Sequence, residues 1–281
     1  MHIGGGILTK TLYISDLDGT LFDPTGKLSG RTVEILNRLI GEGMNFTFAT
    51  ARTIYSAKPL TKALHINVPC ILNNGASVYD LACGEYVKNA YIPTDTAEKL
   101  IRAFHENGIR CFVFKFVDGK LCTCYDNVDN EIMQAYIAER RGRFEQPFIK
   151  CGDVLDCLDG TQIYINSTGD HEKLLPVKNR AAELENTDYA FYEDNYSNDW
   201  YLETFSAEAS KANGIRFLRE KYGFERVVAF GDNLNDLSMF SQADVKIAVE
   251  NAHPDVKKAA DIIIGSNASD GVAEYLLSKF I

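Results

Sequence analysis

Short apolar runs alternate with amphipathic segments at both ends of this chain, and this alternation restricts the folds that it can adopt. The first third carries strand patterns at residues 11–15, 45–49 and 69–72, with a helix pattern over residues 29–42 between the first two. Ser29 is a typical residue to start that helix. A β-α-β order of this kind predicts a parallel sheet covered by helices on both faces.

The same alternation returns near the C-terminal end. Strand patterns at residues 226–230 and 245–249 lie between helix patterns in the part of the chain after Ser210. The middle of the chain differs, because residues 111–117 and 121–125 are two strand patterns joined by an Asp-Gly-Lys turn, as in a hairpin. The sequence therefore predicts an α/β fold: a doubly wound, mainly parallel, Rossmann-like core sheet interrupted by an inserted α+β domain.

The predicted domain boundaries follow these changes of pattern. The core comprises residues 1–88 and 201–281, and the inserted domain comprises residues 89–200. We expect the chain to cross between them near residues 88–93 and 198–204, and these crossings to act as hinges. A chain of 281 residues is long enough for two such domains.

The composition is that of an ordinary globular chain and excludes several kinds of partner. Hydrophobic residues make up 46% of the chain, and no apolar run reaches the roughly 20 residues that a membrane helix needs. The formal net charge of -10 disfavours nucleic acid, whose phosphates are bound by clustered Lys and Arg. The first residues lack a secretory signal pattern, so we expect a cytoplasmic protein with no membrane partner. The oligomeric state stays open.

Carboxylates follow two of the predicted core strands. Asp16 and Asp18 come directly after the first strand, and Asp232 and Asp236 come after the strand at residues 226–230. Ligands of parallel sheets bind beyond the carboxyl ends of the strands. Two groups of acids at this edge suit a hard divalent cation that prefers oxygen ligands, and Mg²⁺ is the obvious candidate.

Other polar groups are expected at the same edge. Thr50 and Arg52 follow the second strand, residues 73–75 (NNG) follow the third, and Lys211 lies at the start of a helix. Hydroxyl, amide and cationic groups are suited to bind an oxyanion such as phosphate. Each of these residues alone would fit a helix cap, a turn or a surface position, but together with the carboxylates they indicate phosphoryl transfer.

Four short motifs resemble those of the haloacid dehalogenase superfamily, in particular its Cof-type phosphatases, in which a large C2-type cap domain lies between the second and third motifs. Residues 15–21 (SDLDGTL) are similar to the first motif and residues 48–52 (FATAR) to the second. Residues 210–211 (SK) are similar to the third, and residues 231–236 (GDNLND) to the fourth. The resemblance covers nearly the whole chain.

This resemblance implies roles for the four carboxylates. Asp16 would be the nucleophile that forms an aspartyl-phosphate, and Asp18 would be the general acid and base. Mg²⁺ would be held by the Asp16 carboxylate, the main-chain carbonyl of Asp18 and Asp232. Asp236 would support this metal shell from outside.

The resemblance also implies a phosphate-binding set. Thr50, the main-chain N–H of Ala51, Lys211 and Asn235 would hold the oxygens of the transferring group. For Arg52 two alternatives are open, a contact with the substrate and an ordinary surface ion pair.

Three positions depart from the usual family motifs. Ala51, Ala212 and Glu250 stand where glycine is usual. At Ala51 and Ala212 the alanine still provides the main-chain N–H donor that a glycine would provide. A carboxylate near phosphate would repel it, so Glu250 either faces away, binds a cationic or hydroxyl-rich part of the substrate, or lies in a solvated loop.

The inserted domain is placed to be a mobile cover that admits substrate and controls water. Its loops are expected to contact the leaving group and set specificity, with residues 159–160, residues 192–195 and Trp200 as candidates. For Trp200 packing is the alternative. Phenylalanines alternate along residues 112–116, and we expect them to form the core face of this domain.

The sequence therefore predicts an Mg²⁺-dependent phosphatase that hydrolyses small phosphorylated metabolites, such as sugar phosphates, through an aspartyl-phosphate. A phosphomutase of the same superfamily is one alternative, and it would need a second basic cluster, for which residues 140–143 (RRGR) are the only candidate run. A catalytically silent regulatory or binding protein is another. A P-loop kinase is excluded, because the chain has no GxxxxGK[ST] segment.

Overall fold

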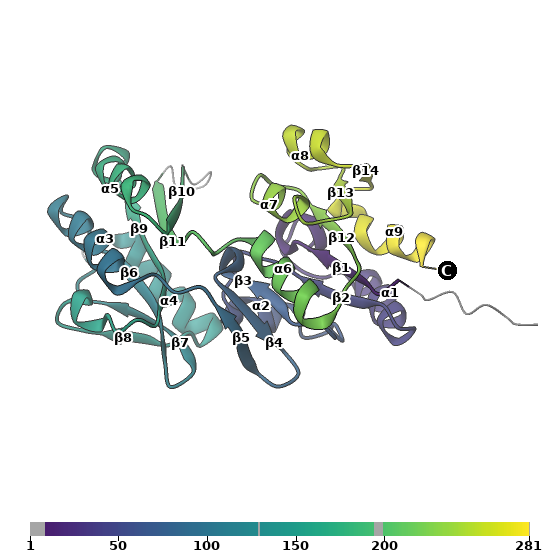
Figure 1. Cartoon of the computed structure of the whole chain (residues 1–281), viewed down its shortest axis with the longest axis horizontal. Helices are drawn as coiled ribbons and strands as arrows, with labels where there is room; N and C mark the ends of the chain where they lie inside the picture. Colours follow the sequence, from purple (N-terminus) through teal and green to yellow (C-terminus); the bar gives the residue numbers. More distant parts are fainter. Residues whose placement is uncertain (1–8, 129, 194–198, 281) are drawn as a thin grey trace, which may run out of the picture. The chain divides into compact units, whose positions relative to one another are not determined.

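The computed structural model describes residues 9–128, 130–193 and 199–280, and the chain divides into two compact units. Unit 1 comprises Met1–Val87 and Ser210–Ile281, and unit 2 comprises Lys88–Ala209 (Figure 1). The predicted return to the core at residue 201 is too early. A boundary there would remove a strand from unit 2 that is paired on both of its edges. Residue 198, at the start of the second predicted hinge, lies outside the described residues.

The main sheet of unit 1 has five strands, all parallel. Their order is β14 (Ile262–Ile264), β13 (Val245–Val249), β12 (Arg226–Gly231), β1 (Thr11–Ser15) and β2 (Asn45–Phe48). The first and last parts of the chain therefore meet where β1 pairs with β12. This is the doubly wound core that the sequence predicts.

A smaller sheet follows β2, and the sequence pattern did not predict most of it. Strand β3 (Cys70–Leu72) pairs with β4 (Ser77–Asp80), and β5 (Glu85–Asn89) completes three strands. One parallel bridge between Ala49 and Ile71 connects β3 to the end of β2. The third predicted strand thus ends at the same edge as β1 and β2.

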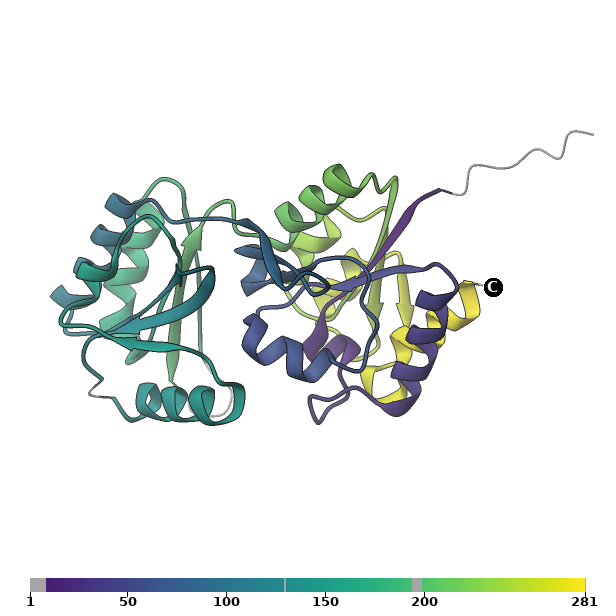
Figure 2. The ribbon, with the colours of Figure 1, turned by 90° about the horizontal axis from the view of Figure 1, so that it is seen from below.

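Helices cover both faces of the main sheet. Figure 2 shows α1 (Gly30–Gly41) and α9 (Gly271–Lys279) on one face and α6 (Lys211–Tyr222) on the other. Ser29 caps α1 as expected, since its hydroxyl accepts a hydrogen bond from the Thr32 N–H at 2.9 Å. The remaining helices of unit 1 are α2 (Ile54–Thr61), α7 (Asp236–Phe240) and α8 (Pro254–Ala259), and the short helical turns are η1 (Leu17–Leu21), η2 (Asn73–Gly75) and η4 (Asn267–Ser269).

The core of unit 1 forms because its central strands are apolar on both faces. Leu12 and Ile14 on β1, Phe46 on β2 and Phe230 on β12 are fully buried. Within the described ranges, no helix combines the length and the apolar character that crossing a bilayer requires.

Unit 2 is built on a six-stranded mixed sheet. Its order is β10 (Thr187–Glu193), β11 (Trp200–Ser206), β9 (Gln162–Gly169), β6 (Phe112–Val117), β7 (Lys120–Tyr125) and β8 (Phe148–Lys150). Neighbours are antiparallel except β7 and β8, and β6 and β7 form the predicted hairpin. Figure 2 shows α3 (Thr94–Glu106) and α5 (His171–Glu183) on one face and α4 (Glu131–Phe144) on the other; η3 (Val154–Cys157) follows β8.

Phe112 and Phe114 are buried, as expected, whereas Phe116 is only partly buried. They do not belong to the cluster that α3 and α5 cover. The core beneath α3 and α5 contains Val113, Ile165 and Leu202 instead. Phe112 and Phe114 are buried on the opposite face of the sheet, because side chains alternate along a strand. The alternation of residues correctly predicted a strand. It does not indicate which face of that strand α3 and α5 would cover.

Candidate active site

The ends of two neighbouring strands bring the predicted carboxylates together. Strands β1 and β12 are paired so that Ser15 lies opposite Phe230. The Asp16 N–H donates to the Phe230 carbonyl at 2.9 Å, which extends the ladder by one residue. Asp16 and the loop that begins at Asp232 therefore leave the sheet side by side.

A buried lysine lies between two of these acids. Lys211 Nζ is 2.5 Å from Asp16 Oδ1 and 2.6 Å from Asp236 Oδ1, and the lysine side chain is 1% exposed. Ser210 caps α6 and so fixes the place of Lys211, because its hydroxyl accepts from the Asn213 N–H. Lys211, in the first turn of α6, thus contacts the carboxylates that follow both β1 and β12.

Burial and charge act in opposite directions on this pair. Burial alone would lower the pKa of Lys211, but the two carboxylates outweigh it and raise the pKa above its ordinary value. Burial also raises the pKa of Asp16, and Asp236 adds to this effect while Lys211 opposes it. An additional cation near Asp16 would therefore stabilise its charged form.

Asp236 holds the loop after β12 in place. Its Oδ2 accepts hydrogen bonds from the N–H groups of Asp232 and Asn233 at 2.9 and 3.0 Å, while its Oδ1 accepts from Lys211. Both oxygens of this fully buried side chain are thus engaged. The arrangement suits a supporting residue better than one that leaves an oxygen open.

Asp232 lies against the loop that follows β1. The Thr20 hydroxyl donates to Asp232 Oδ1 at 2.6 Å. Burial raises the pKa of Asp232 to about 6, against the effect of this hydrogen bond, and the neighbouring Asp236 adds to the rise. Gly19 has a φ of +80°, and a Cβ there would lie 2.3 Å from Asp232 Oδ2. Glycine is required at this position for both reasons.

Three of the carboxylates could share a metal ion. Each of Asp16, Asp232 and Asp236 offers a carboxylate oxygen, and these oxygens lie within 4.8 Å of one another. An all-oxygen set with raised carboxyl pKa values fits a hard divalent cation, whose charge would offset their mutual repulsion.

Asp18 is paired with Arg52. Arg52 donates from Nε to Asp18 Oδ2 and from a terminal nitrogen to Asp18 Oδ1, both at 2.7 Å. The pair is partly exposed, with side-chain exposures of 24% for Arg52 and 49% for Asp18. Of the two alternatives open for Arg52, an ion pair is thus present, and its partner is a predicted catalytic residue.

The phosphate-binding candidates meet at the ends of β2 and β3. The Thr50 carbonyl accepts from the Asn74 N–H at 3.0 Å, and the Asn235 amide donates to Asn74 Oδ1 at 3.2 Å. Thr50 is buried, whereas Ala51 is exposed. Asn74, which the sequence analysis had placed at this edge among residues 73–75, thus links Thr50 to Asn235.

Asn251 is a further residue that the sequence reasoning missed. Its side chain donates to the Gly19 carbonyl at 2.7 Å and accepts from the Asn267 N–H at 3.0 Å, so it fixes the loop after β1. The signal was its place after β13, directly beside Glu250. Glu250 itself is exposed.

The candidates in unit 2 have local roles. Trp200 packs against Phe191 and His171 with ring centroids 4.7 and 4.5 Å away. Asp159 accepts from Lys115. Residues 194 and 195, which belong to the candidate segment 192–195, lie outside the described residues.

The basic run that a mutase would need is also engaged within unit 2. Arg140 lies over the rings of Tyr136 and Phe144, and Arg141 lies over Tyr125 and Phe148. Their guanidinium groups therefore stack on the aromatic side chains around α4.

A second group of possible metal ligands lies in unit 2. It consists of His105, Asp126 and Asp153. Arg110 already lies 3.3 Å from Asp126, which supplies a cation to this group.

The fold and this site define a class of protein, an α/β enzyme with an acidic, lysine-bridged centre at the carboxyl ends of its strands. Residues 13–276 match the family profile of haloacid dehalogenase-like hydrolases, and the chain belongs to this family. The resemblance drawn from the four motifs is therefore confirmed.

Known phosphatases align with this chain over nearly its full length. The pyridoxal phosphate phosphatase of Escherichia coli strain K12 is 27% identical, with 98% of this chain and 100% of that protein aligned. The 5-amino-6-(5-phospho-D-ribitylamino)uracil phosphatase of Bacillus subtilis strain 168 is 25% identical, with 97% of this chain and 98% of that protein aligned. The crystal structure of a haloacid dehalogenase-like hydrolase from Bacteroides thetaiotaomicron is 26% identical, covers 96% of this chain and 99% of its own, and has a TM-score of 0.79. The chain is a phosphatase.

Proposed function

We propose that this phosphatase hydrolyses phosphate monoesters of small metabolites with Mg²⁺ and through an aspartyl-phosphate on Asp16. The observation that carries the proposal is the buried Lys211, which joins the carboxylates of Asp16 and Asp236 at the ends of β1 and β12. A lysine ion-paired on two sides keeps its charge, and a charged lysine beside a nucleophilic carboxylate suits attack on a phosphate dianion. The cytoplasmic location expected from the sequence stays a prediction.

Asp16 and Asp232 would hold the metal, together with the main-chain carbonyl of Asp18. Asp236 would act from outside, because both of its oxygens are already engaged. When bound, Mg²⁺ would offset the repulsion between the Asp16 carboxylate and the phosphate that it attacks.

In the first half of the proposed reaction, a carboxylate oxygen of Asp16 forms a bond to phosphorus and the bond to the leaving oxygen breaks. Asp18, as a carboxylic acid, gives its proton to the leaving alkoxide. In the second half, the Asp18 carboxylate takes a proton from water, the water oxygen binds phosphorus, and the bond to Asp16 breaks. Thr50, the N–H of Ala51, Lys211 and Asn235 would bind the phosphate oxygens.

The ion pair with Arg52 gives Asp18 a resting state. Both Asp18 oxygens accept hydrogen bonds from the Arg52 guanidinium. Asp18 must leave at least one of these bonds before it can donate a proton to a leaving group. A substrate phosphate is a suitable competing partner for the guanidinium, so we propose that Arg52 serves both Asp18 and the substrate.

The test is phosphate release from a panel of monoesters, with Mg²⁺ or with chelator, beside the Asp16→Asn variant. The names of the two relatives supply two members of the panel, and sugar phosphates, nucleotides and an aryl phosphate complete it. We expect release that needs the metal and is lost in the variant. Metal-independent release, or release that survives Asp16→Asn, would contradict the proposal.

A phosphomutase would transfer the phosphoryl group to a second substrate oxygen instead of water. The stacking of Arg140 and Arg141 on aromatic rings gives this alternative no support. Analysis of the panel products for phosphate isomers separates the two activities.

A further inference from the structure

Strand pairing inside unit 2 brings the second group of possible metal ligands together. Strand β8 pairs with the end of β7, and the Cys151 N–H donates to the Tyr125 carbonyl at 2.9 Å, which extends this ladder by one residue. Asp126 and Asp153 therefore leave the sheet next to each other. His105 reaches them from the last turn of α3, which packs against η3. The three side chains come from three parts of one unit.

Both carboxylates of this group are held in place by main-chain hydrogen bonds to one oxygen. Asp126 Oδ1 accepts from the Asn127 N–H. Asp153 Oδ1 accepts from the Leu155 N–H at 2.8 Å, and so caps η3. The Asp126 side chain is only 4% exposed, and Asp153 is partly buried. Carboxylates that are already ordered in this way lose little freedom when the second oxygen binds a cation.

The imidazole of His105 faces these acids with a nitrogen that has no partner. Its Nε2 is buried and makes no hydrogen bond with any described residue. Asp126 Oδ2 lies 3.7 Å from it, which is too far for a hydrogen bond. Two ligands of one tetrahedral metal ion, each about 2.1 Å from the ion, lie about 3.4 Å apart. One ligand atom of Asp153 also lies within 4.8 Å of the other two, so the spacing suits a shared metal ion.

The charge of this group is not balanced by its surroundings. Arg110 brings one positive charge to two carboxylates, with its Nη1 3.3 Å from Asp126 Oδ2. Burial raises the pKa of the neighbouring Cys111 thiol, and Asp126 raises it further. Arg110 opposes this effect, and Asp153 adds to it. A divalent cation bound to both carboxylates would offset the remaining negative charge.

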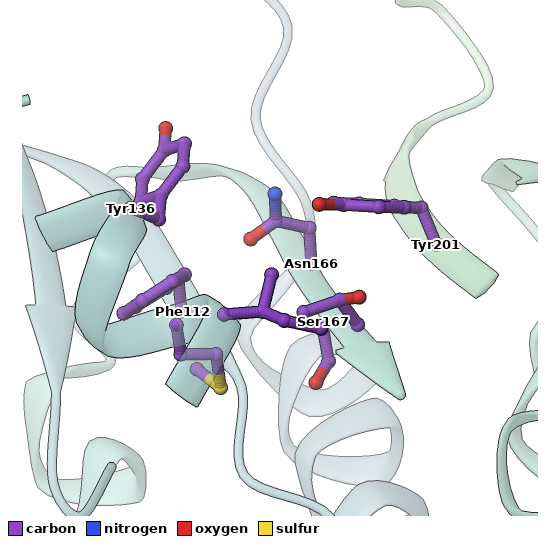
Figure 3. A pocket seen from close by; sticks show the side chains of 8 residues that line it. Phe112, Tyr136, Asn166, Ser167 and Tyr201 are labelled. Carbon is purple, nitrogen blue, oxygen red and sulfur yellow. The ribbon is translucent and has the colours of Figure 1, made fainter. Parts of the chain in front are cut away.

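The donor set separates this group from the cavity on the other face of the sheet. Figure 3 shows that cavity, in which the amide of Asn166 extends between Tyr136 and Tyr201. Its volume is about 30 Å³, enough for one water molecule. None of the described residues that line it is a histidine, a cysteine or a carboxylate. The cavity is therefore suited to water, and the group around His105 is suited to a metal ion.

We propose that unit 2 binds one divalent transition-metal ion through His105 Nε2 and one carboxylate oxygen each of Asp126 and Asp153, with water completing the coordination. An imidazole nitrogen together with carboxylate oxygens suits Zn²⁺ and its first-row neighbours, whereas Mg²⁺ prefers oxygen ligands alone. The ion would join α3, the end of β7 and η3, and so stabilise unit 2. It would be distinct from the catalytic Mg²⁺, whose proposed ligands all belong to unit 1.

Calorimetric titration of Zn²⁺ into chelator-treated, dialysed protein tests this site. The parent protein is the double variant Asp16→Asn and Asp232→Asn, because the carboxylates of unit 1 would also take up Zn²⁺. We expect one ion per chain, with a Kd that His105→Gln weakens at least 10-fold. His65→Gln, at an exposed position of unit 1, is the control and should leave the Kd unchanged. No binding by the parent, or equal binding by His105→Gln, would overturn the inference.

Unfolding experiments separate metal binding from folding. Without metal, His105→Gln should melt at the temperature of the parent, because Nε2 has no hydrogen bond to lose. Zn²⁺ should stabilise the parent but not this variant. Hydrogen exchange followed by mass spectrometry locates the effect, since peptides of α3, β7 and η3 should exchange more slowly with Zn²⁺ while those of β1 and β12 should not. Slowing in β1 and β12 alone would place Zn²⁺ in unit 1 and would refute the proposed site.

Arg110 offers a test that a purely structural role would not meet. It contacts the Asp126 oxygen that the metal would use, and its side chain is 37% exposed. Arg110→Gln removes a competing cation, so it should tighten Zn²⁺ binding about 3-fold or more. Arg143→Gln, on α4, is the control and should leave the Kd unchanged. Unchanged or weaker binding by Arg110→Gln would exclude Asp126 as a ligand and so contradict the site.

Discussion

At the residue scale, Lys211 neutralises two carboxylates that burial would otherwise make costly. Lys211→Met should lower the free energy of unfolding by about 3–5 kcal/mol, because removing one partner of a buried ion pair leaves an uncompensated charge. Chemical denaturation with chelator measures this. Lys221→Met, at an exposed position of the same helix, should stay within about 0.5 kcal/mol. A similar small change for Lys211→Met would show that the two acids are neutral in the folded protein.

Asp232 predicts a pH dependence in the metal-free protein. Its pKa of about 6 lies above the ordinary value near 4, so the folded state holds this proton more tightly than the unfolded chain does. The stabilisation is complete below about pH 4 and is lost as the pH rises through about 6. Asp232→Asn removes the ionisation, so in chelator the variant should gain about 1–2 kcal/mol on the wild type between pH 4 and 7.5, a figure reduced for partial exposure.

The control for this pH series is Asp156→Asn, at an exposed position in unit 2. Its difference from the wild type should not change across the same range. A flat difference for Asp232→Asn as well would mean that the folded and unfolded states bind the Asp232 proton equally tightly.

At the element scale, η2 and the start of α6 are in contact through a glycine. Gly75 has a φ of +102°, and a Cβ there would lie 2.1 Å from the Ser210 carbonyl. Gly75→Ala should therefore destabilise unit 1 by more than about 1 kcal/mol and displace the residue that precedes Lys211. We expect phosphatase activity to fall with it.

The matched control for Gly75→Ala is Gly142→Ala in α4, where a Cβ meets open space and the helix favours alanine. It should be neutral or stabilising in thermal unfolding. If Gly75→Ala behaved in the same way, the close approach to Ser210 would not constrain α6.

How far the sequence predicts each element depends on whether its pattern is local. Period two and period 3.6 locate β1, α1, β12 and α6, and a strand followed by carboxylates locates the edge where they meet. Strand β4 was missed because it is short and paired with β3 after a turn. The pairing of Asp18 with Arg52 brings together residues 34 positions apart, and no local pattern encodes such a contact.

At the scale of the whole molecule, the two units have separate hydrophobic cores. The sequence predicted an insertion, but it placed the second boundary after Trp200, the first residue of β11, whose partners β9 and β10 lie earlier in the chain. The domain to which a strand belongs is decided by its pairing with strands far away in the sequence. The change in hydrophobic pattern along the sequence marks the domain boundary only approximately. Separate cores imply that each unit has its own unfolding equilibrium.

Mg²⁺ should therefore stabilise one unit alone. A ligand that binds only the folded state at 100 times its Kd adds about 2.7 kcal/mol, so amides of unit 1 that exchange through its unfolding should exchange roughly 100-fold more slowly. Hydrogen exchange followed by mass spectrometry, with and without Mg²⁺, measures this for peptides of both units. Peptides of β6 and β9 should be unaffected. Slowing confined to peptides with His105, Asp126 and Asp153 would instead assign the metal to the second group, and equal slowing everywhere would mean that the two cores unfold together.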